Sequence, residues 1–297
     1  MTNSAWNIAT IFKRLLAGRV HGQILARLCF LLTVVTTMSA CSGFFFYQMK
    51  QMVRTPADVG LAYEDLAFTT SDQVKLHGWL LHAEQPRGLV LFLHGNAENI
   101  STHIGSVYWL PEQGYEVLLL DYRGYGRSEG EPDFPEVYAD ADAAYRWAQQ
   151  YAAQKQLPLF ILGQSLGAAI SSYYFGTLPR AEVSYKAVAL DAVFSGHRDI
   201  ARDVAGRSII TWPFQFIVPY LVPKDYDPKT HIAGFAPTPL LFFHSPEDQV
   251  IPYQQGEVVF SRASEPKTWV TTAGPHIATF NYKKNRERLL QFFDANR

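Results

Sequence analysis

The chain has 297 residues, of which 48% are hydrophobic and 18% are charged. This length and balance are typical of one globular α/β domain with a large buried core. The formal net charge of -1 gives no excess of basic residues, so nucleic acid is not expected as a partner. The only cysteines are Cys29 and Cys41, so the sequence beyond Cys41 can form neither an internal disulfide nor a cysteine metal site.

Residues 1–40 have the pattern of an export signal. Four basic residues and no acidic residue precede an apolar run at Leu28–Val35, and small residues then lead to Cys41. The run is shorter than the roughly 20 apolar residues that a membrane span requires. The pattern therefore predicts a signal peptide, or an N-terminal anchor, over residues 1–40.

The tetrapeptide Met38-Ser39-Ala40-Cys41 resembles the lipobox of bacterial lipoproteins, in which the cysteine thiol is acylated and becomes the new N-terminus. The resemblance implies lipidation of Cys41, and Ser42 in the next position implies sorting to the outer membrane. Two or more acyl chains hold a protein stably at a membrane. Two alternatives stay open: an uncleaved helix in the inner membrane, with Cys41 a bystander, and a soluble cytoplasmic protein.

Residues 41–59 are expected to be a linker, in which Phe44–Tyr47 packs against the edge of the domain or dips into the membrane interface. From about residue 60 to the C-terminus, short apolar runs alternate with segments of helical spacing, which predicts βαβ units in a mostly parallel sheet with helices on both faces. The predicted strands are Asp65–Thr70, Val74–His82, Leu89–Leu93, Glu116–Asp121, Leu159–Leu162, Lys186–Leu190, Leu240–Phe243 and Thr268–Thr272. The predicted helices are 101–113, Pro135–Gln154, Leu166–Leu178 and a C-terminal helix that includes Leu289–Phe293.

The segment Ser195–Pro237 interrupts this alternation, because it is rich in proline and aromatic residues. Two interpretations stay open. The segment is either a small cap over the active face, whose apolar residues form an acyl pocket, or a long loop on the flank of the domain.

The pentapeptide Gly163-Gln164-Ser165-Leu166-Gly167 places a G-x-S-x-G pattern between a predicted strand and a predicted helix. A catalytic serine must project from a sharp, strained turn, and glycine on either side removes side chains that would collide there. The N-terminus of the following helix directs N–H groups toward developing negative charge. The pattern by itself is common, but its position between strand and helix favours Ser165 as a nucleophile.

A serine hydroxyl needs a base, and in sheets with this turn the partners follow in the order serine, acid, histidine. Asp248 lies in the loop after the late strand Leu240–Phe243, where the acid is expected. His276 is the only histidine after Asp248, so the order leaves one base. Glu247 and Asp191 are the alternative acids.

The oxyanion formed by such a serine requires backbone N–H donors that are already in place. One is expected at Leu166, directly after the serine, and the other in the loop that follows Leu89–Leu93. In that loop we expect Asn96 to be the donor, with Ala97 as the alternative, and His94 to organise the turn.

Five segments carry a resemblance to a known family. They are His94–Ala97, Asp121–Gly130, Gly163–Gly167, Ser245–Pro252 and Gly274–His276. Together they resemble the BEM46-like group of α/β-hydrolases, which is related to the prolyl oligopeptidase superfamily. The resemblance covers about residues 60–297 and implies the α/β-hydrolase fold, with Ser165, Asp248 and His276 as the triad.

The expected function is hydrolysis of a carboxylic ester, on a small-molecule acyl substrate, through an acyl-enzyme. Peptidase, acyl-peptide hydrolase or thioesterase activity is the first alternative, and a non-catalytic, membrane-anchored binding protein is the second. The sequence contains no P-loop, G-x-G-x-x-G or H-E-x-x-H pattern, so neither a cofactor nor a metal ion is expected.

Overall fold

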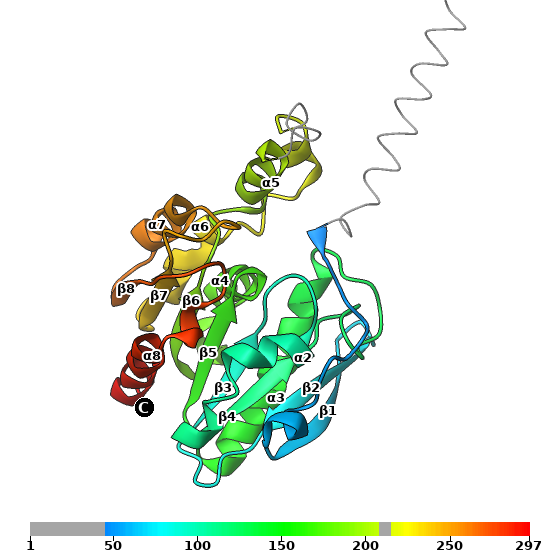
Figure 1. Cartoon of the computed structure of the whole chain (residues 1–297), viewed down its shortest axis with the longest axis vertical. Coiled ribbons are helices and arrows are strands. Elements are labelled where there is room, and N and C mark those ends of the chain that lie inside the picture. The colour runs from blue at the N-terminus through cyan, green and yellow to red at the C-terminus, as the bar shows by residue number, and fades with distance from the viewer. Residues whose placement is uncertain (1–44, 208–214) are drawn as a thin grey trace, which may run out of the picture. The chain divides into compact units, whose positions relative to one another are not determined.

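The structure is a computed structural model that describes residues 45–207 and 215–297 (Figure 1). The predicted signal segment and Cys41 lie outside the described residues. Within the two described ranges, no helix is both long and apolar enough to cross a membrane.

Much of the described part of the predicted linker packs against the α/β domain. Phe46 of the aromatic run is buried against Phe134, with ring centroids 4.9 Å apart, whereas Tyr47 is exposed. A short 3-10 helix, η2 (Pro56–Val59), then leads into the first strand. Within the described residues, contacts with the domain are made from Phe45 onward.

The sheet begins with the predicted hairpin. Strands β1 (Tyr63–Thr69) and β2 (Lys75–Leu81) pair antiparallel, and β2 also pairs antiparallel with β4 (Tyr115–Leu120). The polar turn between β1 and β2 places Gln73 at φ 68°.

The remaining strands are parallel. They are β3 (Gly88–Leu93), β5 (Leu159–Gln164), β6 (Tyr185–Asp191), β7 (Leu240–His244) and β8 (Lys267–Thr271). The spatial order is β1-β2-β4-β3-β5-β6-β7-β8. Strands β3, β4 and β5 are buried along their whole length, as expected for apolar strands covered on both faces. The predicted α/β fold with a mostly parallel sheet is confirmed.

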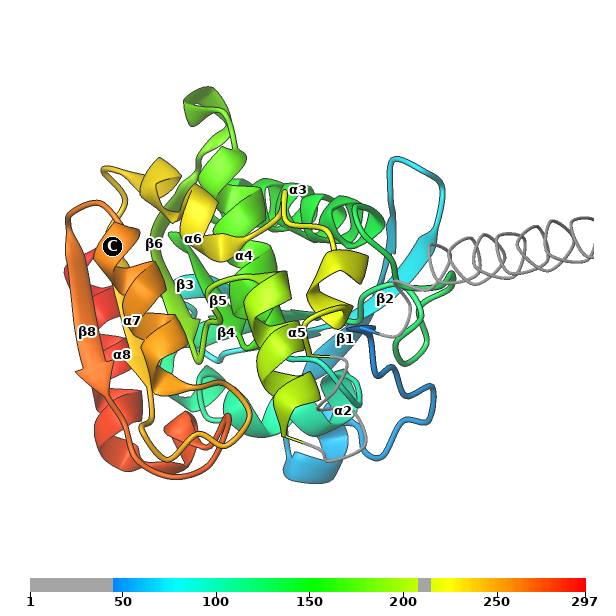
Figure 2. The same ribbon diagram turned by 90° about the horizontal axis from the view of Figure 1, so that it is seen from above.

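Helices cover both faces of this sheet (Figures 1 and 2). Successive side chains of a strand point to opposite faces, so β3 contributes to two cores. Leu91 packs in one core with α3 (Glu136–Lys155) and α4 (Leu166–Thr177). Phe92 packs in the other core with α8 (Lys283–Ala295).

The helix predicted over 101–113 is wrong as a continuous element. The structure has α2 (Ile100–His103), then the 3-10 helices η3 (Ile104–Ser106) and η4 (Pro111–Gln113). Pro111 has no N–H to donate and its ring displaces the preceding turn, so an α-helix cannot pass through it. Gly105 also weakens helical structure at this point.

Residues between β6 and β7 form short helices where they are described. These are α5 (His197–Gly206), η7 (Val218–Leu221), α6 (Pro228–His231) and η8 (Ile232–Phe235). Both α6 and η8 pack against α4, and α5 contacts η7. A further helix that the sequence pattern did not predict, α7 (Tyr253–Arg262), follows β7.

Replacement of Phe160 by alanine tests the core between the sheet and α8. The Phe160 ring is fully buried, with its centroid 5.9 Å from that of Tyr115 and 4.5 Å from that of Phe293. We expect Phe160→Ala to lower the free energy of unfolding by about 3–5 kcal/mol, because the lost ring leaves a cavity. Phe216, which is 67% exposed, is the matched control, and Phe216→Ala should change stability by less than about 0.5 kcal/mol in the same urea titration. Equal effects of the two variants would contradict this description of the core.

Candidate active site

Ser165 occupies a sharp turn between β5 and α4. Its backbone has φ 54° and ψ -113°, a conformation that residues with a side chain rarely adopt. Its N–H donates to the Asp191 carbonyl at 2.8 Å, and its own carbonyl accepts from the Ala169 N–H at 3.1 Å. The turn is thereby held by β6 on one side and by α4 on the other.

The two glycines of the pattern are required by close backbone contacts. A Cβ atom on Gly167 would overlap the carbonyl oxygen of Leu93, at the end of β3. A Cβ atom on Gly163 would lie 2.7 Å from the Gly167 carbonyl oxygen. Helix α4 therefore begins directly against the end of β3, which brings the loop after β3 next to Ser165.

The structure brings His276 and Asp248 to Ser165. His276 Nε2 lies 2.9 Å from Ser165 Oγ, and His276 Nδ1 lies 2.7 Å from Asp248 Oδ2. Ser165 follows β5, Asp248 follows β7 and His276 follows β8, so the three residues come from the same edge of the parallel sheet. The histidine ring thus connects the hydroxyl to the carboxylate.

The Asp248 carboxylate is buried, and both of its oxygens have hydrogen-bond partners. Its Oδ1 accepts from the N–H groups of Val250 at 2.8 Å and Ile251 at 2.9 Å, while its Oδ2 faces His276. Burial by itself raises the pKa of this carboxyl, but the hydrogen bond and charge of His276, with the two N–H groups, outweigh burial and lower the pKa. Asp248 is therefore an anion at neutral pH, which fixes the Nδ1–H tautomer of a neutral His276.

The alternative acids do not contact the His276 ring, but both support it from a distance. Asp191 accepts from Gln164 Nε2 at 2.8 Å and from Thr279 Oγ1 at 2.7 Å, so it links the residue before Ser165 to the loop after His276. Glu247 Oε2 accepts from the Gly274 N–H at 2.9 Å. From the sequence, both residues were expected only as alternative acids. The position of Asp191 at the end of a strand next to β5 was the signal for its supporting role.

The loop after β3 lies against Ser165, since a Cβ atom on Gly95 would be 3.4 Å from Ser165 Cβ. The Ala97 N–H donates to Asn96 Oδ1 at 2.9 Å, so this N–H already has an acceptor. The Asn96 N–H has no acceptor among the described residues, and Leu166 is the first residue of α4, where N–H groups lack partners within the helix. The geometry thus favours Asn96 over Ala97 as a backbone donor.

His94 and Arg123 are structural. His94 is fully buried, its Nδ1 lies 2.7 Å from the Gly95 carbonyl oxygen, and burial lowers its pKa, so its ring is neutral. Arg123 is buried and pairs with Asp140 at 2.8 Å and with Asp72 at 2.8 Å. Both residues therefore shape the turns beneath the site.

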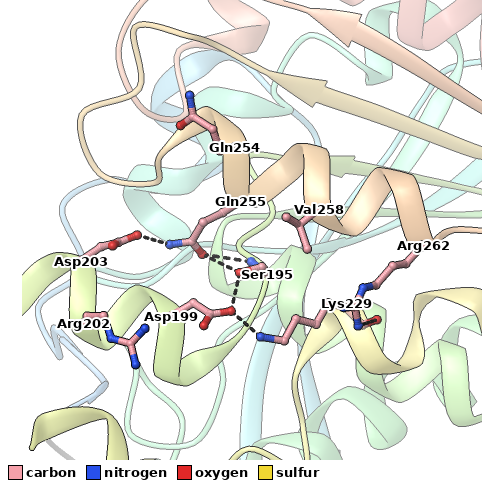
Figure 3. Close-up of a pocket in the computed structure, with 9 residues that line it drawn as sticks. All are labelled: Ser195, Asp199, Arg202, Asp203, Lys229, Gln254, Gln255, Val258 and Arg262. Atoms are coloured by element: carbon pink, nitrogen blue, oxygen red, sulfur yellow. Dashed lines mark hydrogen bonds and ion pairs between the residues drawn. The ribbon is translucent and has the colours of Figure 1, made fainter. Parts of the chain in front are cut away.

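A pocket of about 340 Å³ lies between α5, α6 and α7 (Figure 3). Eight of its nine lining residues are polar or charged, with an ion pair between Lys229 and Asp199 and a hydrogen bond from Ser195 Oγ to Asp199 at 2.6 Å. This lining does not fit the apolar acyl pocket expected from the segment Ser195–Pro237. An apolar cluster instead joins Ala169, one helical turn after Ser165, to the residues Phe194, Ile200 and Ile251, with Phe45 packed against it.

Comparisons with known proteins agree with this architecture. A family model described as "Serine aminopeptidase, S33" matches residues 84–232. The "Uncharacterized protein YfhR" of Escherichia coli is 31% identical over 257 residues, which cover 84% of this chain and 86% of that protein. "Protein bem46" of Schizosaccharomyces pombe is 25% identical over 225 residues, which cover 73% of this chain and 71% of that protein.

A solved structure of the esterase Pf2001 from Pyrococcus furiosus superposes with a TM-score of 0.70. The superposition covers 84% of this chain and 97% of the esterase, at 19% sequence identity. At this identity the similarity establishes the fold.

The buried Asp191 carboxyl provides a pH-dependent test of the support beneath the site. Burial raises the pKa of Asp191 to about 6, although the hydrogen bonds from Gln164 and Thr279 act in the opposite direction. Because the folded pKa lies above the unfolded value of 3.8, the stability linked to this group is present below pH 3.8 and is lost as pH rises through about 6. The free energy of unfolding of Asp191→Asn relative to wild type should therefore increase by up to about 3 kcal/mol between pH 4 and pH 7.

Urea unfolding at the two pH values measures this change. The exposed Asp225 is the control, and Asp225→Asn should show the same difference from wild type at both pH values. A difference for Asp191→Asn that does not vary with pH would show that the carboxyl is not destabilised by burial.

Proposed function

The chain belongs to the serine aminopeptidase, S33, family of α/β-hydrolases and to its BEM46-like group, and we propose that it hydrolyses carboxylic esters with Ser165 as the nucleophile. The observation that carries the proposal is the position of the His276 ring, 2.9 Å from Ser165 Oγ and 2.7 Å from Asp248 Oδ2. A hydroxyl in contact with a base that is itself oriented by a carboxylate is equipped for acyl transfer.

In the first half of the proposed reaction, Ser165 Oγ attacks the carbonyl carbon of the ester while its proton passes to His276 Nε2. The tetrahedral intermediate carries a negative charge on the former carbonyl oxygen. The bond from carbon to the alkoxy oxygen then breaks as His276 returns the proton to that oxygen. An alcohol leaves, and the acyl group stays on Ser165 as an ester.

In the second half, water replaces the alcohol and follows the same path. His276 takes a proton from the water as its oxygen attacks the acyl carbon. The bond to Ser165 Oγ breaks as the proton returns to that oxygen, which releases a carboxylic acid and restores the serine.

Asp248 and two backbone N–H groups complete the proposed machinery. Asp248 holds the ring of His276 and stabilises the imidazolium that forms during each transfer. The N–H groups of Asn96 and Leu166 donate to the oxyanion, where one such donor contributes about 100- to 1000-fold in rate. Their position beside Ser165 supports this assignment.

For the substrate, we propose an ester with a small or medium acyl chain. Phe194, Ile200 and Ile251 form a buried apolar cluster with Ala169 of α4, and apolar residues near a nucleophile favour an alkyl group over a charged one. In this proposal the segment 195–237 is a small cap, since Ile200 of α5 joins the apolar cluster beside α4. Amides and thioesters are the competing substrates, and the aminopeptidase description of the family favours testing amides first.

We also propose that the enzyme is exported and lipidated at Cys41, so that it works at the outer membrane or its periplasmic face. The basic, apolar and small-residue pattern of residues 1–40 supports this location. Anchoring in the inner membrane by an uncleaved N-terminal helix is the alternative.

The proposed nucleophile is tested with a fluorophosphonate probe and with p-nitrophenyl esters of increasing chain length. We expect wild type to be labelled and to hydrolyse short and medium esters, and Ser165→Ala to lose labelling and about 10⁶-fold in kcat. Asp248→Asn keeps the shape of the acid but not its charge, and we expect a loss of about 10⁴-fold in kcat. The matched control is Glu247→Gln, which changes the neighbouring carboxylate and should retain far more activity than Asp248→Asn.

Labelling that survives Ser165→Ala would overturn the assignment of the nucleophile. Faster turnover of aminoacyl p-nitroanilides than of any p-nitrophenyl ester would overturn the ester preference and favour the peptidase.

The proposed lipidation is tested by cell fractionation and mass spectrometry of Cys41→Ala. Wild type should remain with the membrane and carry the mass of acyl chains, whereas Cys41→Ala should lack that mass because no thiol is available. Cys29→Ala, which changes the other cysteine, should behave as wild type. Membrane retention and mass that are the same in wild type and Cys41→Ala would favour the uncleaved anchor.

A further inference from the structure

The segment Phe45–Val53, called the strap below, runs along the loop that carries Asn96. It lies before the first strand and outside residues 84–232, which match the family model (blue at the start of the coloured chain in Figure 1). Gln48 forms a parallel bridge with Glu98, and the Met49 N–H donates to the Glu98 carbonyl at 3.1 Å. The strap thus pairs with the loop as a short additional strand would.

The side chain of Asn96 is fixed mainly by this strap. Its Nδ2 donates to the Phe45 carbonyl at 2.6 Å, and its Oδ1 accepts from the Tyr47 N–H at 2.9 Å. The same Oδ1 accepts from Tyr125 Oη at 2.7 Å and from the Ala97 N–H at 2.9 Å. With both ends of the amide bonded, the side chain has no freedom to rotate, and the direction of the Asn96 backbone N–H is restricted with it.

The loop needs such support because its backbone is strained. Ala97 and Glu98 are consecutive residues with φ 66° and φ 58°, in the left-handed region that residues other than glycine rarely occupy. Strained backbone persists only where surrounding contacts determine it. Asn99, which is fully buried, supplies two of these contacts by donating from Nδ2 to the carbonyls of Met49 at 2.9 Å and Gln51 at 2.8 Å.

The strap is also attached to the body of the domain, independently of this loop. Phe46 is buried against Phe134, and the Gly126 N–H donates to the Met49 carbonyl at 2.9 Å. Lys50 Nζ donates to the Ser128 carbonyl at 2.8 Å. The strap can therefore hold the loop in place instead of moving with it.

We propose that the strap is a positioning element of the active site, which aims the Asn96 N–H at the oxyanion and so sets the rate of acyl transfer. The proposal rests on the proposed function, because it concerns how the N–H that donates to the oxyanion of that reaction is held in place. It makes turnover depend on a segment that begins four residues after Cys41, far in sequence from Ser165 and His276. Asn96, Asn99 and Tyr125 are positioning residues in this scheme.

The test uses two substitutions in the full-length chain. Asn99→Asp keeps the acceptor that bonds the Ser101 N–H at 2.9 Å but removes both donations to the strap. Tyr125→Phe keeps the ring but removes one bond to Asn96 Oδ1, and it carries the test if Asn99→Asp fails to fold. Tyr47→Phe is the matched control, because it removes the hydroxyl of an exposed strap side chain and leaves the bond from the Tyr47 N–H to Asn96 in place.

Three quantities separate positioning from general damage: kcat and KM for a p-nitrophenyl ester, and the inhibition constant of an aryl trifluoromethyl ketone, whose adduct with serine carries an oxyanion. We expect Asn99→Asp to lower kcat about 10- to 100-fold, with KM within about twofold of wild type, since only the transition state uses the donor. The inhibition constant should rise by a similar factor. Tyr125→Phe should show the same pattern at about three- to tenfold, and Tyr47→Phe should match wild type.

The proposal is overturned if kcat of every folded variant stays within twofold of wild type. It is also overturned if kcat falls while the affinity for the ketone does not change. Both outcomes require a wild type that is labelled by fluorophosphonate at Ser165, so failure of the strap proposal is distinguishable from failure of the proposed function, in which wild type itself is neither labelled nor active.

Discussion

The contact between Gly167 and the end of β3 is the constraint on which the site depends. Helix α4 starts so close to Leu93 that no side chain fits between them, and Ser165 must then adopt a positive φ to connect β5 to the helix. The close approach brings two features to one point, the helix N-terminus and the loop after β3. Main-chain packing thus brings the Ser165 hydroxyl next to the loop after β3 and the first turn of α4.

The order of the strands supplies the remaining groups. Strands β5, β6, β7 and β8 are consecutive neighbours, so the loops that follow them lie side by side at one edge of the sheet. Ser165, Asp248 and His276 come from three of these loops. The last residue of β6 is Asp191, a buried carboxylate that links the residue before Ser165 to the loop after His276 by accepting hydrogen bonds from Gln164 and Thr279.

Features determined by local chemistry could be predicted from the sequence. The apolar runs at Leu89–Leu93 and Leu159–Leu162 predicted central strands, because only a strand covered on both faces excludes polar residues so fully. The spacing of G-x-S-x-G and the single histidine after Asp248 led to the three residues that the structure brings together. The helix predicted over 101–113 is wrong as one element, because Gly105 and Pro111 divide the segment into short helices.

Features determined by distant partners could not be predicted. The role of Asp191 depends on hydrogen bonds from Gln164 and Thr279, which lie 27 and 88 positions away in the chain. The bonds from Asn96 and Asn99 to the strap join side chains to carbonyl groups about fifty residues away, and such bonds leave no periodic pattern in a sequence. Nothing in the sequence around Asn96 and Asn99 indicates that these side chains bond to a distant segment.

The strap has a consequence for the way this protein would be recombined with its relatives. The family model begins at residue 84 and the first strand at Tyr63, so either boundary is a natural place to join two homologous chains. A chimera joined at either point would inherit every strand and helix that carries Ser165, Asp248 and His276. It would nevertheless take the strap, whose backbone bonds the Asn96 side chain, from the other parent. The range that matches the family model and the range that holds the oxyanion loop therefore have different boundaries.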